Sequence, residues 1–217
     1  MNDTVTEHPS NKSKQGNIWD ERYNSESFFY GTQPNDFLVE QSRFISEKAS
    51  VLCLAEGEGR NAVYLASLPT QPEVTALDSS SVGLEKAKKL AESKNVRIHT
   101  QFADLNDADL GEQTWDAIVS IWCHLPSALR AKLHLKVIRA LKPGGVLILE
   151  AYTPAQLNFK TGGPQDLDML MSLDTLKIEL AGLDLLVAQE KERDIQEGQG
   201  HSGPSAVVQI VARRPFN

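Results

Sequence analysis

The 217-residue sequence has few of the residues that mark disulfide-rich, metal-binding, nucleic-acid-binding or membrane-spanning proteins. Its two cysteines, Cys53 and Cys123, lie in apolar runs and form no CxxC pair, which favours buried free thiols in a reducing compartment. Its five histidines have no ligand spacing, so no metal site is expected. The net charge is −7 and no run of lysine or arginine occurs, which argues against a nucleic-acid partner. No apolar stretch approaches the ~20 residues that span a bilayer.

The beginning of the chain, MNDTVTEHPSNKSK, lacks the apolar segment of a secretion signal and carries acidic residues. We therefore expect a cytoplasmic protein without a membrane partner. A chain of this length most often forms one domain with a substantial core. We expect a flexible tail over residues 1–17 and a single domain over 18–214, in which residues 18–45 form a helical segment or lid. The oligomeric state has no signal in the sequence.

Strand-like apolar runs alternate with helical patterns along the chain. Strands are expected at about 51–54, 74–77, 96–100, 115–122, 146–150, 183–192 and 206–212. Helices are expected at about 62–66, 82–93, 126–141 and 174–180, the last one capped by Asp174. The final two strands are connected too closely for a crossover helix, so we expect an antiparallel hairpin there. Five βα units followed by such a pair predict an α/β fold.

The most informative segment is a glycine-rich turn that follows the first apolar strand. Gly57 and Gly59 lie in this turn, and a helix follows it directly. Glycine permits positive φ and a close approach of the backbone to a ligand, and the helix N-terminus offers free N–H groups. The next apolar strand ends at Asp78, whose carboxylate can accept hydrogen bonds from a ribose diol. The pattern predicts a site for an adenosine-containing cofactor.

Two other functions compete with this interpretation. The spacing from Gly57 to Ala62 also fits a dinucleotide fingerprint, so a nicotinamide-dependent oxidoreductase is one alternative. Such an enzyme commonly uses Tyr-x-x-x-Lys, yet none of the four tyrosines has lysine four residues on, and little chain remains for a substrate domain. The other alternative is a non-catalytic module that binds the cofactor or serves as a scaffold.

Together the motifs resemble the class I S-adenosylmethionine-dependent methyltransferases over roughly residues 18–214. Residues 53–59 correspond to the glycine loop of that superfamily, and Asp78 corresponds to its ribose-binding acid. Residues 103–105 match the segment that holds adenine, and 142–145 match the turn before the fifth strand. The resemblance implies S-adenosyl-L-methionine as cofactor. It also implies a doubly wound seven-stranded sheet in the order 3-2-1-4-5-7-6, with the last strand antiparallel and helices on both faces.

Within the superfamily, WDERY at 19–23, YGT at 30–32 and EGRNA at 58–62 resemble the tellurite-resistance and thiopurine methyltransferase-like group. This resemblance implies a small acceptor with a soft nucleophile, namely a thiol or a selenium or tellurium oxyanion. Oxygen, nitrogen or protein acceptors stay open. Cys53 and Ala55 depart from the usual acid and glycine of the loop. Either Glu56 or Glu58 then faces the cofactor's ammonium in place of that acid, or neither does.

These considerations give a set of candidate site residues. The expected cofactor contacts are Glu56, Gly57, Gly59, Asn61, Asp78, Ser79, Asp104, Leu105 and Ile121. Glu56 can instead be a solvated loop carboxylate, and Asp104 a turn or capping residue. The expected acceptor contacts are Trp19, Tyr23, Tyr30 and Arg193. The aromatic residues of the N-terminal segment would form a lid, or only a helix packed on the sheet.

Two histidines are the catalytic candidates. His124 follows the fourth strand, and His201 lies between the last two strands, where the resembling tellurite-resistance enzymes have an active-site histidine. Imidazole titrates near neutral pH and can take a proton from a thiol. Each histidine also has a simpler interpretation, as a capping residue for His124 and an exposed loop residue for His201.

Overall fold

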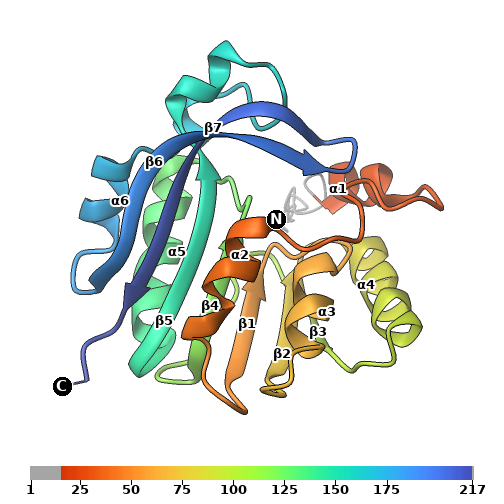
Figure 1. Ribbon diagram of the computed structural model, residues 1–217, viewed down its shortest axis with the longest axis horizontal. Helices are drawn as coiled ribbons and strands as arrows, with labels where there is room; N and C mark the ends of the chain where they lie inside the picture. Colours follow the sequence, from red (N-terminus) through yellow and green to blue (C-terminus); the bar gives the residue numbers. More distant parts are fainter. Residues whose placement is uncertain (1–15, 217) are drawn as a thin grey trace, which may run out of the picture.

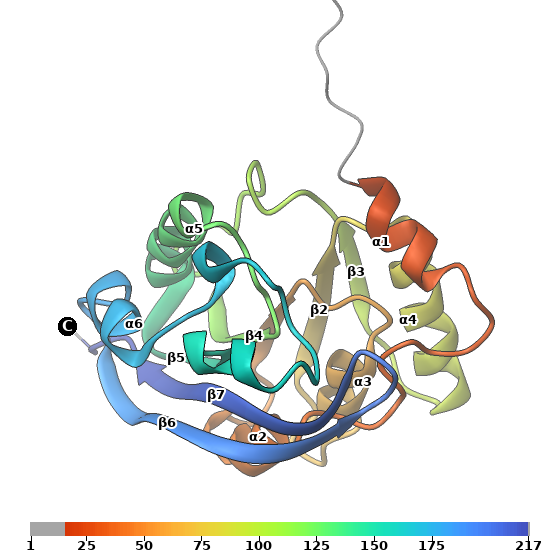
Figure 2. The same ribbon diagram turned by 90° about the horizontal axis from the view of Figure 1, so that it is seen from above.

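The computed structural model describes residues 16–216, which form a seven-stranded sheet with helices on both faces (Figures 1 and 2). The strand order is β3-β2-β1-β4-β5-β7-β6, as expected. Among the described strands, β7 alone runs in the opposite direction to the other six. The strands are β1 (Ser50–Leu54), β2 (Glu73–Asp78), β3 (His99–Phe102), β4 (Trp115–Ile121), β5 (Leu141–Tyr152), β6 (Asp184–Glu197) and β7 (His201–Arg213).

The helices also follow the expected alternation. They are α1 (Gly16–Tyr23), α2 (Asp36–Gln41), α3 (Arg60–Ala66), α4 (Ser81–Ser93), α5 (Ser127–Ala140) and α6 (Leu173–Glu179), with short 3₁₀ turns η1 (Ser42–Phe44), η2 (Pro154–Asn158) and η3 (Leu167–Met169). Residues 1–15 of the expected tail lie outside the described residues, and residues 16 and 17 belong to α1. Helix α6 is capped by Ser172, whose side chain accepts from the N–H of Thr175, and not by Asp174.

Alternate side chains of the central strands pack on opposite faces of the sheet. In β1, Val51 and Cys53 join the core under α2, α3 and α4. Leu52 and Leu54 join the core under α5 and α6. Each fully buried side chain of this size stabilises the fold by about 1.5–3 kcal/mol. A strand covered on both faces explains why the sequence is almost entirely apolar there.

The last two strands are longer than expected, and β3 lies slightly later than expected. The segment 197–203, expected to be a loop, is a tight turn of residues 198–200 because pairing continues to Glu197 and His201. Gly198 has φ +64°, and a Cβ there would lie 2.4 Å from the carbonyl oxygen of Phe29. The expected turn at 142–145 is a bulge inside β5, since Leu141 pairs with Trp115 and Val146 pairs with Ala117.

The β6–β7 hairpin bends over the carboxyl ends of the central strands and reaches the N-terminal segment (Figure 1). At its tip, the N–H of Gln199 donates to the carbonyl of Phe29 at 2.8 Å. The hairpin and the N-terminal segment together form a roof over the edge of the sheet where ligands of open α/β folds bind. Every helix between residues 16 and 216 is too short or too polar to cross a bilayer.

Candidate active site

A cavity of about 740 Å³ lies at the carboxyl edge of the sheet, beside the switch point between β1 and β4. Its walls come from the N-terminal segment, the ends of β1, β2, β3 and β4, the loop at 162–164 and the start of β7. Most of the predicted site residues line it: Trp19, Tyr23, Tyr30, Glu56, Asn61, Asp78, Ser79, Asp104, Leu105, Ile121, His124 and His201. Gly57, Gly59 and Arg193 do not.

Asp78 ends β2 and is only 7% exposed. Its Oδ2 accepts from the N–H of Gly57 at 2.8 Å, and its Oδ1 accepts from the N–H of Ser80 at 2.7 Å. Burial raises the pKa of this carboxyl above its usual value. Each carboxylate oxygen has a second lone pair, so both can still accept from hydroxyl groups in the cavity. These two acceptor oxygens fit the two hydroxyl groups of a ribose diol.

Glu56 is held at the first turn of α3. Its Oε1 accepts from the N–H groups of Asn61 and Ala62 at 2.9 and 2.8 Å. Burial raises the pKa of Glu56 to about 7. Glu58 is engaged elsewhere, because its Oε1 pairs with Lys86 at 2.5 Å and its Oε2 accepts from the N–H of Phe29. Of the two loop glutamates, Glu56 is therefore the one that can face a cation in the cavity.

The two loop glycines have positive φ as expected, +62° for Gly57 and +92° for Gly59. Their missing side chains, however, make room for protein and not for a ligand. A Cβ on Gly59 would lie 2.5 Å from the Cβ of Ala87 in α4, and one on Gly57 would lie 2.6 Å from the hydroxyl of Tyr23. The structure thus gives these two glycines a packing role, and their contact with a cofactor stays a prediction. Ala55, at a position usually held by glycine, also adopts a left-handed conformation with φ +48°.

Asp104 forms the expected turn and also lies on the cavity wall. Its Oδ1 accepts from the N–H of Asn106 at 2.8 Å, as in an Asx turn. It nevertheless lines the cavity together with Leu105, directly after β3. The turn therefore presents a carboxylate to the cavity.

His124 lines the cavity but has no free nitrogen. Its Nε2 accepts from the N–H of Tyr152 at 3.0 Å, and its Nδ1 donates to the carbonyl of Trp122 at 3.1 Å. Burial lowers the pKa of His124 to about 4. The ring thus connects the ends of β4 and β5 as a neutral structural residue. This geometry corrects the expectation that His124 acts as a general base.

His201 is not an exposed loop residue, because it begins β7 and is 6% exposed. Its ring stacks on Tyr30 with centroids 4.7 Å apart and lies 4.9 Å from the ring of Trp122. Its Nδ1 shares a hydrogen bond of 2.8 Å with the hydroxyl of Tyr152. Burial, and then the nearby Arg60, lower the pKa of His201 far below its usual value. A neutral imidazole therefore faces the cavity among aromatic rings.

Arg193 is turned away from the cavity by a buried ionic network. Its Nε and Nη2 bind both oxygens of Glu150 at 3.0 and 2.9 Å, which corrects its expected role as an acceptor contact. Glu150 is fully buried and pairs with Asn35, which also donates to Glu197 at 2.8 Å. Glu197 pairs with Arg60 at 2.5 Å. The sequence signalled no link between Asn35 and Glu150, which are 115 residues apart.

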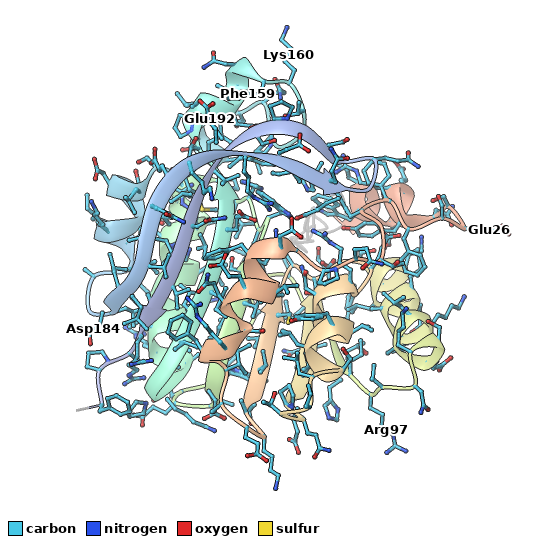
Figure 3. The ribbon with its side chains drawn as sticks, viewed as in Figure 1. Glu26, Arg97, Phe159, Lys160, Asp184 and Glu192 are labelled. Carbon is cyan, nitrogen blue, oxygen red and sulfur yellow. The ribbon has the colours of Figure 1, made fainter. Side chains whose placement is uncertain are left out.

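The N-terminal segment, residues 16–35, closes one side of the cavity. Lys86 in α4 donates to the carbonyls of Tyr23, Ser25 and Ser27 at 3.2, 2.8 and 2.7 Å. Glu26, between two of these residues, marks the outer end of the segment in Figure 3. The segment also brings Arg22 to the cavity wall, which the sequence analysis had not singled out.

Comparisons with known proteins agree with this geometry. Residues 51–145 match the family described as Methyltransferase domain. The ubiquinone/menaquinone biosynthesis C-methyltransferase UbiE of Geotalea daltonii is 31% identical over 128 residues, which are 57% of this chain and 54% of that protein. The matched segment thus spans about half the length of this relative.

Two solved structures share the fold. One, from work on the conversion of a disulfide bond into a thioacetal group during echinomycin biosynthesis, is 18% identical with TM-score 0.75 and covers 94% of this chain and 93% of its own. TehB from Haemophilus influenzae is 21% identical with TM-score 0.67, covering 93% of this chain and 67% of its own. The chain therefore has the seven-stranded fold of these two structures, and its residues 51–145 match the methyltransferase domain family.

Proposed function

We propose that this chain binds S-adenosylmethionine and transfers its methyl group to a small acceptor. The observation that carries the proposal is the position of Asp78, a buried carboxylate with free lone pairs at the end of β2, in a cavity beside the switch point of a methyltransferase sheet. The match of residues 51–145 to the methyltransferase domain family supports the same activity. A nicotinamide-dependent reaction has no comparable support in the cavity.

The residues of the cavity fit the parts of this cofactor. Asp78 would accept from the ribose hydroxyls, and Glu56 would face the ammonium. Asp104 and Leu105 would border adenine, and Ile121 would contact the cofactor at the end of β4. S-adenosylmethionine supplies a methyl group that its sulfonium already activates. The chain then has to align the acceptor and exclude water, and the roof of hairpin and N-terminal segment serves both purposes.

We further propose that the acceptor is a soft nucleophile, namely a thiol or a selenium or tellurium oxyanion. The cavity wall includes the aromatic rings of Tyr30, Trp122 and His201, which suit a small polarizable group. His124 has both nitrogens occupied, and His201 is a weak base. A selenium or tellurium oxyanion is already anionic near neutral pH and needs no base. A thiol is partly ionised there, because its usual pKa of about 8.5 is close to neutral. The resemblance of residues 19–23 and 30–32 to the tellurite-resistance group supports this class.

The proposal is tested with methyl-labelled S-adenosylmethionine and a panel of acceptors: small thiols, selenite, tellurite, a phenol and an amine. We expect tight cofactor binding by calorimetry and label transfer to the thiols or to the selenium or tellurium oxyanions. His201→Ala should lower turnover more than cofactor affinity. Binding without transfer to any acceptor would favour the scaffold alternative, and tighter binding of NADH would favour the oxidoreductase.

A further inference from the structure

Arg22 is a cation on the cavity wall that has no acidic partner within residues 16–216. The other arginine of the wall, Arg60, is 6% exposed and pairs with Glu197. Lys86 is paired with Glu58 just outside the wall. The unpaired acids of the wall are Glu56, Asp78 and Asp104. The cavity therefore offers several carboxylates and one uncompensated positive charge.

Aromatic contacts hold the guanidinium of Arg22 in place. It lies 4.7 Å from the ring centroid of Trp19 and 5.3 Å from that of Phe29. Its Nη1 donates to the hydroxyl of Tyr30 at 2.9 Å. Cation–π contacts of this kind orient the guanidinium without neutralising it, so its remaining N–H groups stay available for an anion.

The placement of α1 brings Arg22 to the glycine loop. The next residue, Tyr23, packs its hydroxyl directly over Gly57. Asp20 lies two residues before Arg22, and its Oδ1 accepts from the hydroxyl of Ser80 at 2.5 Å. This contact docks α1 beside Asp78. Helix α1 lies beside α4 (Figure 2). Tyr23 at the end of α1 packs against Gly83 near the N-terminus of α4. Arg22 thus borders the part of the cavity between the glycine loop and Tyr30.

We propose that Arg22 binds the carboxylate of the cofactor's amino-acid portion. This inference rests on the proposed function. S-adenosylmethionine carries two positive charges, on the ammonium and the sulfonium, and one negative charge, on the carboxylate. Glu56 and Asp78 suit the cationic and hydroxyl groups, and Arg22 is the group on the wall that suits the carboxylate. Glu56 and Arg22 would then hold the two ends of the amino-acid portion in a loop where Cys53 stands at the usual position of the acid.

The test is calorimetric binding of three nucleosides that are not consumed: S-adenosylhomocysteine, its decarboxylated analogue, and 5′-methylthioadenosine, which lacks the whole amino-acid portion. Arg22→Gln removes the charge. Arg43→Gln is the matched control, because Arg43 lies 5.2 Å from the ring of Phe44 but outside the cavity wall. We expect Arg22→Gln to weaken S-adenosylhomocysteine about tenfold or more, since a charge-assisted bidentate contact is lost. Binding of the other two nucleosides should stay within about twofold.

Wild-type protein should itself bind the decarboxylated analogue about tenfold more weakly than S-adenosylhomocysteine, whatever the behaviour of the variant. Equal weakening of all three nucleosides by Arg22→Gln, or unchanged binding of S-adenosylhomocysteine, overturns the assignment of Arg22. In the second case, a raised KM for the acceptor would place Arg22 at the acceptor instead. Failure of wild-type protein to bind S-adenosylhomocysteine at all would overturn the proposed function. This outcome differs from those that overturn only the assignment of Arg22, in which wild-type protein binds S-adenosylhomocysteine.

Discussion

Asp78 and Glu56 are carboxylates on the wall of one cavity, Asp78 buried and Glu56 half-buried, and backbone N–H groups hold both of them. Asp78 accepts one N–H on each oxygen, whereas Glu56 accepts two on a single oxygen. Hydrogen bonds from the backbone favour the charged form and burial opposes it, and burial is the larger effect in both. Replacing the carboxylate of Asp78 by an amide leaves one backbone N–H without an acceptor, whereas the single oxygen that Glu56 uses can be kept. The two residues therefore respond differently to such a substitution.

Asp78→Asn should weaken binding of S-adenosylhomocysteine at least about tenfold. The substitution removes the charge, and an amide NH₂ would face the N–H of either Gly57 or Ser80, so one backbone donor loses its acceptor. A lost charge-assisted hydrogen bond costs about 1.5–3 kcal/mol. Calorimetry measures the affinity. Thermal melting measures how much the contacts of Asp78 contribute to stability. Unchanged affinity would show that Asp78 does not bind the ribose.

Glu56→Gln should change how stability depends on pH. The pKa of Glu56 is about 7 in the folded chain, above its usual value of 4.5. Between these values the unfolded chain has lost a proton that the folded chain keeps, so rising pH lowers the free energy of unfolding. Glutamine keeps an oxygen for the N–H groups of Asn61 and Ala62 but does not titrate.

Relative to wild type, the free energy of unfolding of Glu56→Gln should therefore rise by about 1–3 kcal/mol between pH 4.5 and 7.5, at roughly 1.4 kcal/mol per pKa unit. Urea unfolding at a series of pH values measures this difference. Glu85→Gln, with an exposed side chain on α4, is the control and should show no such window. If the free energy of unfolding of Glu56→Gln and of wild type changed with pH in parallel, the raised pKa of Glu56 would be disproved.

At the scale of elements, α4 and the N-terminal segment act as a unit. The ammonium of Lys86 binds three carbonyls of the segment and the buried carboxylate of Glu58. Glu58 in turn accepts from the N–H of Phe29. The eight-residue helix α1 of this segment has little stability of its own, so the closure of the cavity depends on these tertiary contacts.

Lys86→Met should loosen residues 23–30 while leaving the sheet intact. The methionine chain can fill the same space, but three carbonyls lose their donor and Glu58 loses its cation. Hydrogen–deuterium exchange should rise in residues 23–30 and stay unchanged in β1 and β4. Lys88→Met is the control on the same helix, since Lys88 pairs only with the exposed Glu85. Exchange that does not differ between the two variants would contradict the role of Lys86.

At the scale of the whole molecule, the buried ionic network joins elements from both ends of the chain. Asn35 comes from the N-terminal segment, Arg60 from α3, Glu150 from β5, and Arg193 and Glu197 from β6. The hairpin is thereby fixed over the cavity. Trp122, at the end of β4, adds a hydrogen bond from its indole N–H to Glu197 at 2.6 Å.

Arg193→Gln should lower the free energy of unfolding by about 3–5 kcal/mol, because it leaves the fully buried Glu150 without its cation. Chemical denaturation measures this loss. Lys191→Gln is the control, since Lys191 is exposed on the same strand and should change stability by less than about 0.5 kcal/mol. A loss for Arg193→Gln no larger than the control's would mean that Gln209 and Asn35 satisfy Glu150 by themselves.

The sequence by itself determined the sheet and the position of Asp78, which ends β2 at the edge that carries the cavity. These features depend on local patterns: apolar runs for doubly covered strands, glycines with positive φ after β1, and an acid at the end of β2. Strand limits were less accurate, since β6 and β7 extend through polar residues. Backbone pairing with the neighbouring strand, and not side-chain periodicity, sets their length.

Only the tertiary structure decided which polar side chains remain free to act. Gly59 proved to make room for Ala87, and Arg193 proved to be held by Glu150. His124 lost its role because its two nitrogens meet backbone groups of β4 and β5. The partners in these contacts lie from two to 43 residues away, and local sequence carries no record of them. A side chain's chemistry depends on its partners and its burial, and both arise only when distant segments pack together.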